Sequence, residues 1–106
     1  MSFTGVWDVI ASPDFDDDSL RMDVDPSISV EQEGKRISGE YQVGIQQGTI
    51  DGRLRDDAYV FFSFEGYDEM DEVNSAGTIT LNGDRLAFTL MYHHGDDYTF
   101  ECVQRR

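Results

Sequence analysis

The sequence has few of the residues on which most protein chemistry depends. Its 106 residues include one cysteine, two histidines, one tryptophan and one lysine. The single cysteine, Cys102, excludes an intramolecular disulfide and has no partner at metal-ligand spacing. The sequence also lacks an N-terminal basic segment followed by an apolar one, and it has no run of about 18 apolar residues. We therefore expect a cytoplasmic protein that neither crosses nor inserts into a membrane.

Basic residues are scarce as a class. Eight Lys and Arg residues stand against 22 Asp and Glu residues, which gives a formal net charge of −14. Because phosphate contacts need clustered Lys and Arg, nucleic acid and anionic membranes are excluded as partners. The single lysine, Lys35, beside so many aspartates is compatible with either a high-salt host or a GC-rich genome. The length predicts one domain over residues 1–106, with a single hydrophobic core.

The sequence also lacks a sustained helical periodicity, whereas apolar and polar residues alternate from Ile28 onward. Short segments of even length separated by turn residues are typical of an all-β sandwich or barrel. The acidic stretch joins the first two segments. The expected strands are 4–11, 27–33, 36–43, 46–54, 59–66, 75–81, 85–92 and 97–103.

Glycines face bulky residues in the hairpins that the turn residues predict. A turn at Gly44-Ile45 pairs Tyr41 with Gly48, Gly39 with Ile50, and Ile37 with Gly52. A three-residue turn at 56–58 then sets Leu54 opposite Val60, Gly52 opposite Phe62, and Ile50 opposite Phe64. Such pairing of large with small residues favours a strongly curved sheet, because its concave side has no room for two bulky side chains.

Two further turns extend the same inward face to the C-terminus. A two-residue turn at Asn82-Gly83 pairs Leu81 with Asp84, Ile79 with Leu86, and Gly77 with Phe88. A three-residue turn at 94–96 pairs Tyr92 with Tyr98, Leu90 with Phe100, and Phe88 with Cys102. A curved meander removes its edges by closing, so we predict an all-β, antiparallel up-and-down meander of about eight strands closed into a barrel. The predicted inward set is Ile28, Val30, Ile37, Tyr41, Val43, Ile50, Leu54, Val60, Phe62, Phe64, Ile79, Leu81, Leu86, Phe88, Leu90, Tyr92, Tyr98 and Phe100.

Two short motifs resemble those of the calycins, the superfamily of small barrels that includes lipocalins, fatty-acid-binding proteins and avidins. They are Gly5-Val6-Trp7 on the first strand and Arg105-Arg106 after the last. The stretch ISGEYQVGIQQGTIDG is also similar to hairpins of small bacterial barrels of this type. The resemblance implies a calycin-like barrel in which Trp7 closes one end and stacks on Arg105 or Arg106.

The departures from these families prevent the transfer of a ligand. The chain stops at its last strand, whereas lipocalins usually continue into a helix, and one tryptophan is too few for an avidin-like biotin site. Fatty-acid-binding proteins hold a carboxylate with inward Arg and Tyr, but the predicted register points Arg53 and Arg85 outward.

Two acidic stretches and one histidine pair are the candidate metal sites. Asp14, Asp16 and Asp18 match the first ligand positions of an EF-hand loop, but Ser19 stands where Gly is needed, and Asp25 stands where Glu is needed. We interpret residues 13–25 as a solvated connection, and residues 67–72 as a second acidic loop between strands. A loosely bound calcium or magnesium ion at the clustered carboxylates remains open.

His93 and His94 are neighbours, and neighbouring strand residues point to opposite faces, which disfavours a shared ion. Cys102 falls on the inward face, where a thiol is usually inert, and no serine has the context of a nucleophile. We therefore predict no catalytic residue, no metal site, no cofactor and no enzymatic activity.

Two functions remain open. In the first, the barrel binds a small apolar or aromatic molecule, with Tyr41, Phe62, Phe64, Tyr92 and Tyr98 lining the site. In the second, the barrel is filled, and the protein acts by docking or by forming a homodimer through outward apolar residues on its strands. Those residues are Tyr59, Phe61, Met91 and Val103.

Overall fold

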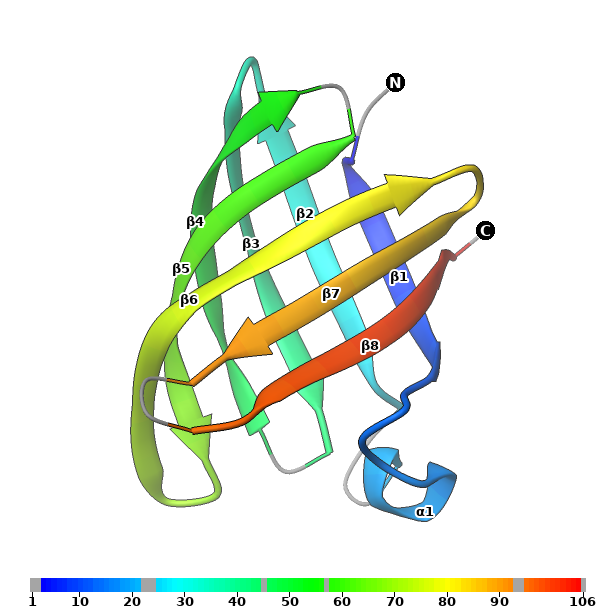
Figure 1. The fold of residues 1–106 in the computed structure, drawn as a ribbon, viewed down its shortest axis with the longest axis vertical. Coiled ribbons are helices and arrows are strands. Elements are labelled where there is room, and N and C mark those ends of the chain that lie inside the picture. Colours follow the sequence, from blue (N-terminus) through cyan, green and yellow to red (C-terminus); the bar gives the residue numbers. More distant parts are fainter. Residues whose placement is uncertain (1–2, 22–24, 45, 57, 93–94, 106) are drawn as a thin grey trace.

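The computed structural model describes residues 3–21, 25–44, 46–56, 58–92 and 95–105. It contains one short helix, α1 (Asp17–Leu20), between the first two strands. Each strand pairs with the next in antiparallel orientation, and β8 pairs with β1, which closes the barrel (Figure 1). The strands are β1 (Gly5–Ala11), β2 (Ser27–Glu33), β3 (Arg36–Val43), β4 (Gln46–Asp56), β5 (Tyr59–Asp68), β6 (Asp71–Asn82), β7 (Arg85–Met91) and β8 (Asp97–Gln104). The predicted eight-stranded antiparallel meander, closed into a barrel, is confirmed.

The predicted registers of β3, β4 and β5 are confirmed. Tyr41 pairs with Gly48, Gly39 with Ile50, and Gly52 lies between Ile37 and Phe62. Gly44 has a φ of 60°, the left-handed conformation that a tight turn requires at this position. The pairs between β3 and β4, in which each glycine faces a bulky residue, therefore follow from the position of the turn at Gly44.

The predicted registers around β7 are wrong by two residues. Ile79 pairs with Phe88 and Gly77 with Leu90, because the turn is centred on Gly83-Asp84 rather than on Asn82-Gly83. Of these two turn residues, Gly83 carries the positive φ, which suits the type of turn that needs Gly at its first central position. A shift of two residues leaves each side chain on its predicted face.

The connection from β7 to β8 is longer than predicted. The backbone N–H of Tyr92 donates to Asp96, and that of Gly95 donates to Tyr92, so the turn closes directly after β7. Phe88 consequently pairs with Phe100, Leu90 pairs with Tyr98, and Leu86 pairs with Cys102. The predicted pairing of Tyr92 with Tyr98 is therefore wrong.

The stretch 67–72, predicted as an acidic loop, instead forms the ends of two long strands. β5 continues to Asp68 and β6 begins at Asp71, with Glu69 and Met70 as a two-residue turn. Glu69 has a φ of 60° and Met70 is 92% exposed. Cross-strand hydrogen bonding therefore extends past the apolar alternation from which the strand ends were predicted.

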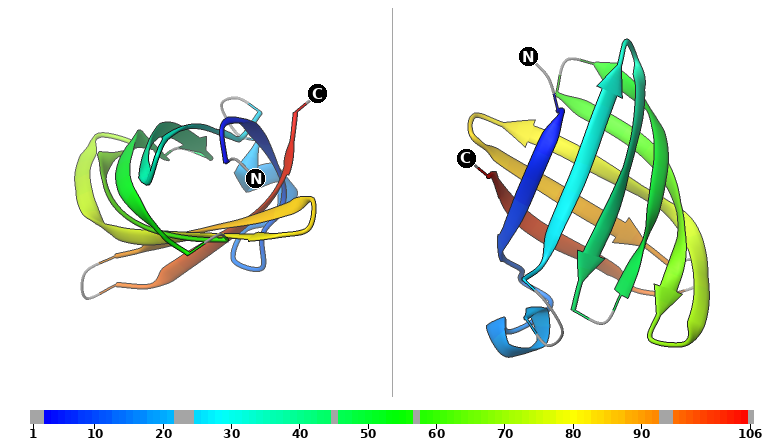
Figure 2. Two further views of the ribbon diagram at one scale, coloured as in Figure 1. Left: turned by 90° about the horizontal axis from the view of Figure 1, so that it is seen from above. Right: turned by 180° about the vertical axis from the view of Figure 1, so that it is seen from behind.

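The two ends of the barrel are covered by different segments. Phe3 is buried near the N-terminus, where its backbone carbonyl accepts a hydrogen bond from the Trp7 indole N–H at 2.9 Å. The segment containing α1 lies at the other end (Figures 1 and 2). No helix in the described ranges is long and apolar enough to cross a membrane.

Aromatic rings pack against one another inside the barrel. Phe62 and Phe88 are stacked, with ring centroids 5.3 Å apart, and Phe88 lies 6.2 Å from Phe100. Every residue of the predicted inward set is either buried or packed against the buried core. The alternation of the sequence therefore identified the core correctly.

Candidate functional site

The five residues predicted to bind a ligand lie together inside the barrel. Tyr41 contacts Phe64 edge-to-face with ring centroids 6.1 Å apart, and Phe64 contacts Tyr92 in the same way at 5.6 Å. Tyr92 in turn lies 5.4 Å from Tyr98, and Phe62 stacks on Phe88. The five side chains thus lie close together, but their rings pack on aromatic neighbours, and none of the five lines the apolar pocket described below.

A polar cluster lies at the end of this aromatic group. The Tyr92 hydroxyl donates a short hydrogen bond to Oε1 of Gln46, the one buried polar or charged residue in the described part of the chain. Gln46 pairs with Asp68 in the register of β4 and β5. Sequence reasoning missed Gln46 and Asp68. Gln46 precedes the inward Gly48 by two residues, and Asp68 follows the inward Gly66 by two, so the alternation of a strand alone places both side chains inward.

Tyr41 and Tyr92 have pKa values raised by burial, so both remain neutral at physiological pH. Burial raises the pKa of Tyr41 to about 12, and the nearby charge of Asp68 adds to the effect. Burial likewise raises the pKa of Tyr92, with smaller contributions from Tyr41, Asp68 and Tyr98. The Tyr41 hydroxyl is buried and has no hydrogen-bond partner among the described residues. The cluster therefore contains one hydroxyl whose hydrogen-bonding capacity is unused.

A small apolar pocket adjoins this cluster, between α1 and the strand ends. Its volume is about 170 Å³, and Gln46 reaches it from β4. Its other lining residues are Phe15, Ser19, Leu20, Val43, Gly44 and Phe100. Together, the pocket and the Tyr41, Gln46, Asp68, Tyr92 and Tyr98 cluster form the candidate site, which we call the α1-end site.

Residues 12–21 cover this pocket rather than forming only a solvated connection. The Phe15 ring is stacked on Phe100 with centroids 5.7 Å apart, and Leu20 is 2% exposed. The backbone N–H of Gly44 donates to the carbonyl of Leu20 at 3.2 Å. Apolar residues at 15 and 20, between the aspartates, are the signal that could have indicated this packing.

Two aspartates in this segment accept hydrogen bonds from backbone N–H groups. Asp14 accepts from the N–H of Thr99 at 2.8 Å, and Asp16 accepts from the N–H of Ser19 at 2.8 Å. The hydrogen bonds from Ser19 lower the pKa of Asp16. Within the described ranges, no three His, Cys, Asp or Glu side chains are grouped so that they could hold a metal ion. His93 and His94 lie outside those ranges.

Of the predicted barrel-closing residues, Trp7 and Arg105 are described, and they lie on opposite faces of the sheet. Trp7 is 3% exposed on the inward face of β1, whereas the Arg105 guanidinium binds the carboxylate of Asp8 on the outward face, at 2.5 Å. Arg105 therefore pairs with an acid outside the barrel instead of stacking on Trp7. Arg106 lies outside the described residues.

The residues predicted to form a homodimer do not gather into one apolar patch. Phe61 is 42% exposed. The Cζ atom of the Arg55 guanidinium lies over the Phe61 ring, 6.0 Å from the ring centroid. Phe61 pairs with Thr78 on β6, whereas Met91 on β7 pairs with Ala76. Tyr59, like Met91, is half-buried. β6, which carries Thr78 and Thr80 on its outer side, therefore separates Tyr59 and Phe61 on β5 from Met91 on β7.

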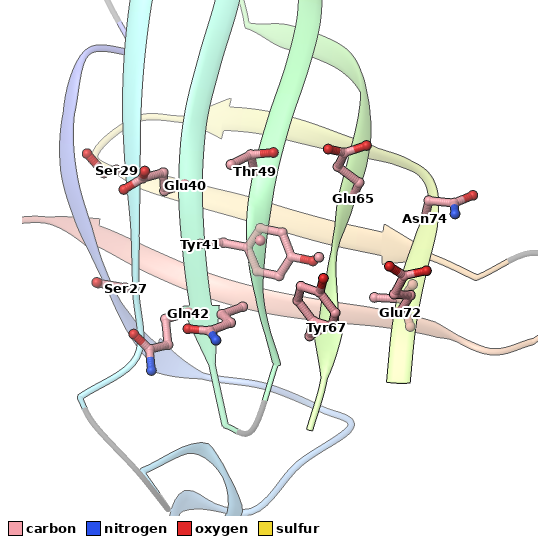
Figure 3. Close-up of a pocket in the computed structure, with 14 residues that line it drawn as sticks. Ser27, Ser29, Glu40, Tyr41, Gln42, Thr49, Glu65, Tyr67, Glu72 and Asn74 are labelled. Carbon is pink, nitrogen blue, oxygen red and sulfur yellow. The ribbon is translucent and has the colours of Figure 1, made fainter. Parts of the chain in front are cut away.

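The outer face of the sheet from β2 to β6 carries a larger hollow, of about 660 Å³, which we call the outer groove (Figure 3). It is lined by Ser27, Ser29, Glu40, Tyr41, Gln42, Gln47, Gly48, Thr49, Glu65, Gly66, Tyr67, Glu72, Val73 and Asn74. Sequence reasoning did not find it, because polar outward residues in alternating strands are the ordinary pattern of a solvated face. Only the curvature of the sheet turns this face into a concave surface.

Comparisons with protein families and with curated proteins found no match. No model of a protein family matches the sequence, and no curated protein matches it at a significant level.

Proposed function

We propose that the protein is a non-catalytic binding module with a calycin-like barrel, which takes up one small apolar or aromatic molecule at the α1-end site. The observation that carries this proposal is the apolar pocket whose lining includes Gln46, the buried polar side chain that accepts from the Tyr92 hydroxyl. Ligand sites in proteins commonly combine apolar walls with a few polar groups that orient the ligand. The pocket, with Gln46 among apolar side chains, has this composition.

The volume of the pocket limits the size of the ligand. Drug-sized ligands occupy pockets of about 300–1,000 Å³, whereas apolar cavities of about 150 Å³ take up benzene. A pocket of about 170 Å³ therefore suits a molecule of one or two small rings. A larger ligand would need residues 12–21 to move away from Gly44 and Phe100.

Charge near the site selects against anions. Asp68 faces the polar cluster, and Asp14, Asp16 and Asp18 lie on the covering segment, while the whole chain carries −14. An anionic ligand would be repelled by these carboxylates, since like charges within a few ångströms interact unfavourably. The expected ligand is therefore neutral, with one hydrogen-bonding group for Gln46.

The proposal can be tested with indole, phenol and benzene as probes. A ligand present at about 100 times its Kd stabilises the folded protein by about 2.7 kcal/mol, which thermal unfolding detects. Leu20→Trp should fill the pocket and remove the shift, whereas Met70→Trp, at a side chain that is 92% exposed, should leave it intact. No stabilisation of the parent protein by any of the three probes, or an equal loss in both variants, would contradict the proposal.

The packing of the barrel supports a second candidate function. Because the rings of Tyr41, Phe64, Tyr92 and Tyr98 contact one another, a filled barrel that acts only through its outer strands is also consistent with this interior. Analytical ultracentrifugation would test self-association, with Phe61→Asp as the disrupting variant. A monomer at all concentrations, unchanged by that substitution, would exclude a homodimer through Phe61.

A further inference from the structure

Two rows of outward side chains form the walls of the outer groove. The strand register places Ser29, Glu40, Thr49, Glu65 and Asn74 side by side across β2 to β6. It places Ser27, Gln42, Gln47, Tyr67 and Glu72 in a second row, two residues further along each strand. Figure 3 shows these side chains projecting from five neighbouring strands. The groove therefore runs across the strands.

The floor between the two rows carries almost no side chains of its own. Its residues are Tyr41, Gly48, Gly66 and Val73, whose side chains, where present, point inward. A Cβ at Gly48 would lie 2.7 Å from the Tyr41 hydroxyl and 2.8 Å from the Cα of Gly66. The close approach of β4 and β5 at these glycines produces a floor without protrusions, with the unpartnered Tyr41 hydroxyl lying against its inner side.

The charge of the groove has one sign. Its lining contains Glu40, Glu65 and Glu72, and none of the 14 lining residues is Lys or Arg. No ion pair of these three glutamates is found in the part of the chain that the structure describes. Four described arginines pair with acids outside the groove: Arg36 and Arg53 with Asp51, Arg85 with Asp84 and Glu101, and Arg105 with Asp8. A cationic ligand would therefore meet three carboxylates that none of these four arginines neutralises.

The three glutamates are not grouped around one metal ion. Adjacent strands lie about 4.8 Å apart, so the backbone positions of Glu40 and Glu65, separated by β4 in one row, are about 10 Å apart along the sheet. Glu72 is one strand and one row further, about 8 Å from Glu65. Among the described residues, no three His, Cys, Asp or Glu side chains are grouped so that they could hold a metal ion. The backbone positions of the three glutamates instead extend over about 16 Å.

We propose that the outer groove binds a linear aliphatic polyamine, which lies across β3 to β6. Its ammonium groups pair with Glu40, Glu65 and Glu72, and the hydroxyl and amide oxygens of the two rows accept its remaining N–H groups. The Tyr67 ring, 46% exposed, offers a π face to a cation. An extended tetraamine matches the line of carboxylates in length. A peptide matches less well, because the lining gives apolar side chains little to pack against.

Spermine, titrated at an ionic strength of about 0.15 M and followed by amide NMR and calorimetry, tests the proposal. We expect chemical-shift changes centred on Gly48, Thr49, Gly66 and Asn74, and weaker binding by putrescine, which spans fewer carboxylates. Glu65→Gln and Glu72→Gln should each weaken spermine binding about two- to fivefold, the range of an exposed ion pair. Thr49→Arg should abolish binding by placing a cation in the middle of the groove.

The matched control separates a site from general attraction to an acidic protein. Glu31→Gln combined with Glu33→Gln removes the same charge as Glu65→Gln combined with Glu72→Gln, but on β2 outside the groove. At this ionic strength the Debye length is about 8 Å, and the control pair, which is outside the lining of the groove, should leave the affinity within about twofold of the parent protein. Equal weakening by both pairs, shifts spread over the whole surface, or equal binding of magnesium ions would overturn the proposal.

Discussion

Two tyrosines in the α1-end site differ in one hydrogen bond. Tyr92 donates to Gln46, whereas the Tyr41 hydroxyl is buried without a partner among the described residues. A buried polar group without a partner costs about 1–3 kcal/mol, whereas a satisfied one contributes about 1 kcal/mol. Tyr41→Phe should therefore raise the free energy of unfolding by about 1 kcal/mol, as measured by urea denaturation.

Tyr92→Phe is the matched control, because it removes the same atom from a bonded position. It should lower the free energy of unfolding by about 1 kcal/mol and leave Gln46 without its donor. A loss of stability in Tyr41→Phe as large as that in Tyr92→Phe would show that the Tyr41 hydroxyl has a partner, such as a bound water.

Buried acids make the stability of the barrel fall at high pH. Burial, followed by the charges of Asp8 and Glu101, raises the pKa of Cys102 to about 12, and burial raises that of Tyr41 to about 12. In the unfolded chain these groups lose their protons at about pH 9 and 10, so above those values the unfolded state binds fewer protons than the folded state. The free energy of unfolding should fall from about pH 9 to about pH 12.

Denaturation with urea across this pH window would measure the effect. Combining Cys102→Ala with Tyr41→Phe should flatten the fall, because two of the groups with raised pKa values are gone. A free energy of unfolding that stays constant or rises across the window would contradict the burial of these groups.

At the level of the strands, Gly52 permits β4 and β5 to lie close together. A Cβ there would lie 2.6 Å from the carbonyl oxygen of Phe61 and 2.6 Å from the Cβ of Phe62. Because backbone cannot move out of the way cheaply, Gly52→Ala should lower the free energy of unfolding by about 3 kcal/mol. Chemical denaturation measures the change.

Gly34→Ala provides the comparison for this substitution. Gly34 has a φ of 62° and nothing within 4 Å of its Cβ position, so alanine costs only the conformational strain, about 1 kcal/mol. If Gly52→Ala costs no more than Gly34→Ala, the close approach of the strands is not a requirement of the fold.

The hairpins also show how far turn residues determine register. The pairs of β3, β4 and β5 that the turns predict are confirmed. The second of these turns is shorter than the predicted three residues, because Asp56 pairs with Tyr59 after a register shift between Leu54 and Asp56. The residues Asn82-Gly83 are compatible with two positions of the turn between β6 and β7. The connection after β7 closes through backbone hydrogen bonds of Tyr92, which do not depend on any particular residue type and so could not be predicted. Register was therefore predictable where local geometry was unambiguous.

For the molecule as a whole, net charge opposes compactness. A charge of −14 on a domain of 106 residues repels itself, and salt screens repulsion between exposed charges. The melting temperature should therefore rise with sodium chloride concentration, which differential scanning calorimetry measures. Glu31→Gln with Glu33→Gln should reduce the size of the rise, because two charges are removed. A melting temperature that does not change with salt would show that repulsion has little effect on stability.

The candidate site was predictable only in part. Alternation placed Tyr41, Phe64, Tyr92 and Tyr98 inside the barrel, and they do contact one another. It did not show that Phe15 and Leu20 would cover this end, because their packing depends on where α1 meets the turn at Gly44. Side-chain direction is a local property, whereas cover and cavity depend on distant segments.

Alternation and glycine placement were enough to predict the strands, the inward face and the closure of the barrel, because they act through neighbouring residues and adjacent strands. The hydrogen bonds and the hollows, in contrast, arise only in the folded molecule. Folding leaves the Tyr41 hydroxyl without a described partner, brings Asp14 and Asp16 to backbone N–H groups, and aligns Glu40, Glu65 and Glu72 along one groove. Those outcomes depend on the curvature of the whole sheet, to which every strand contributes and which no single segment encodes.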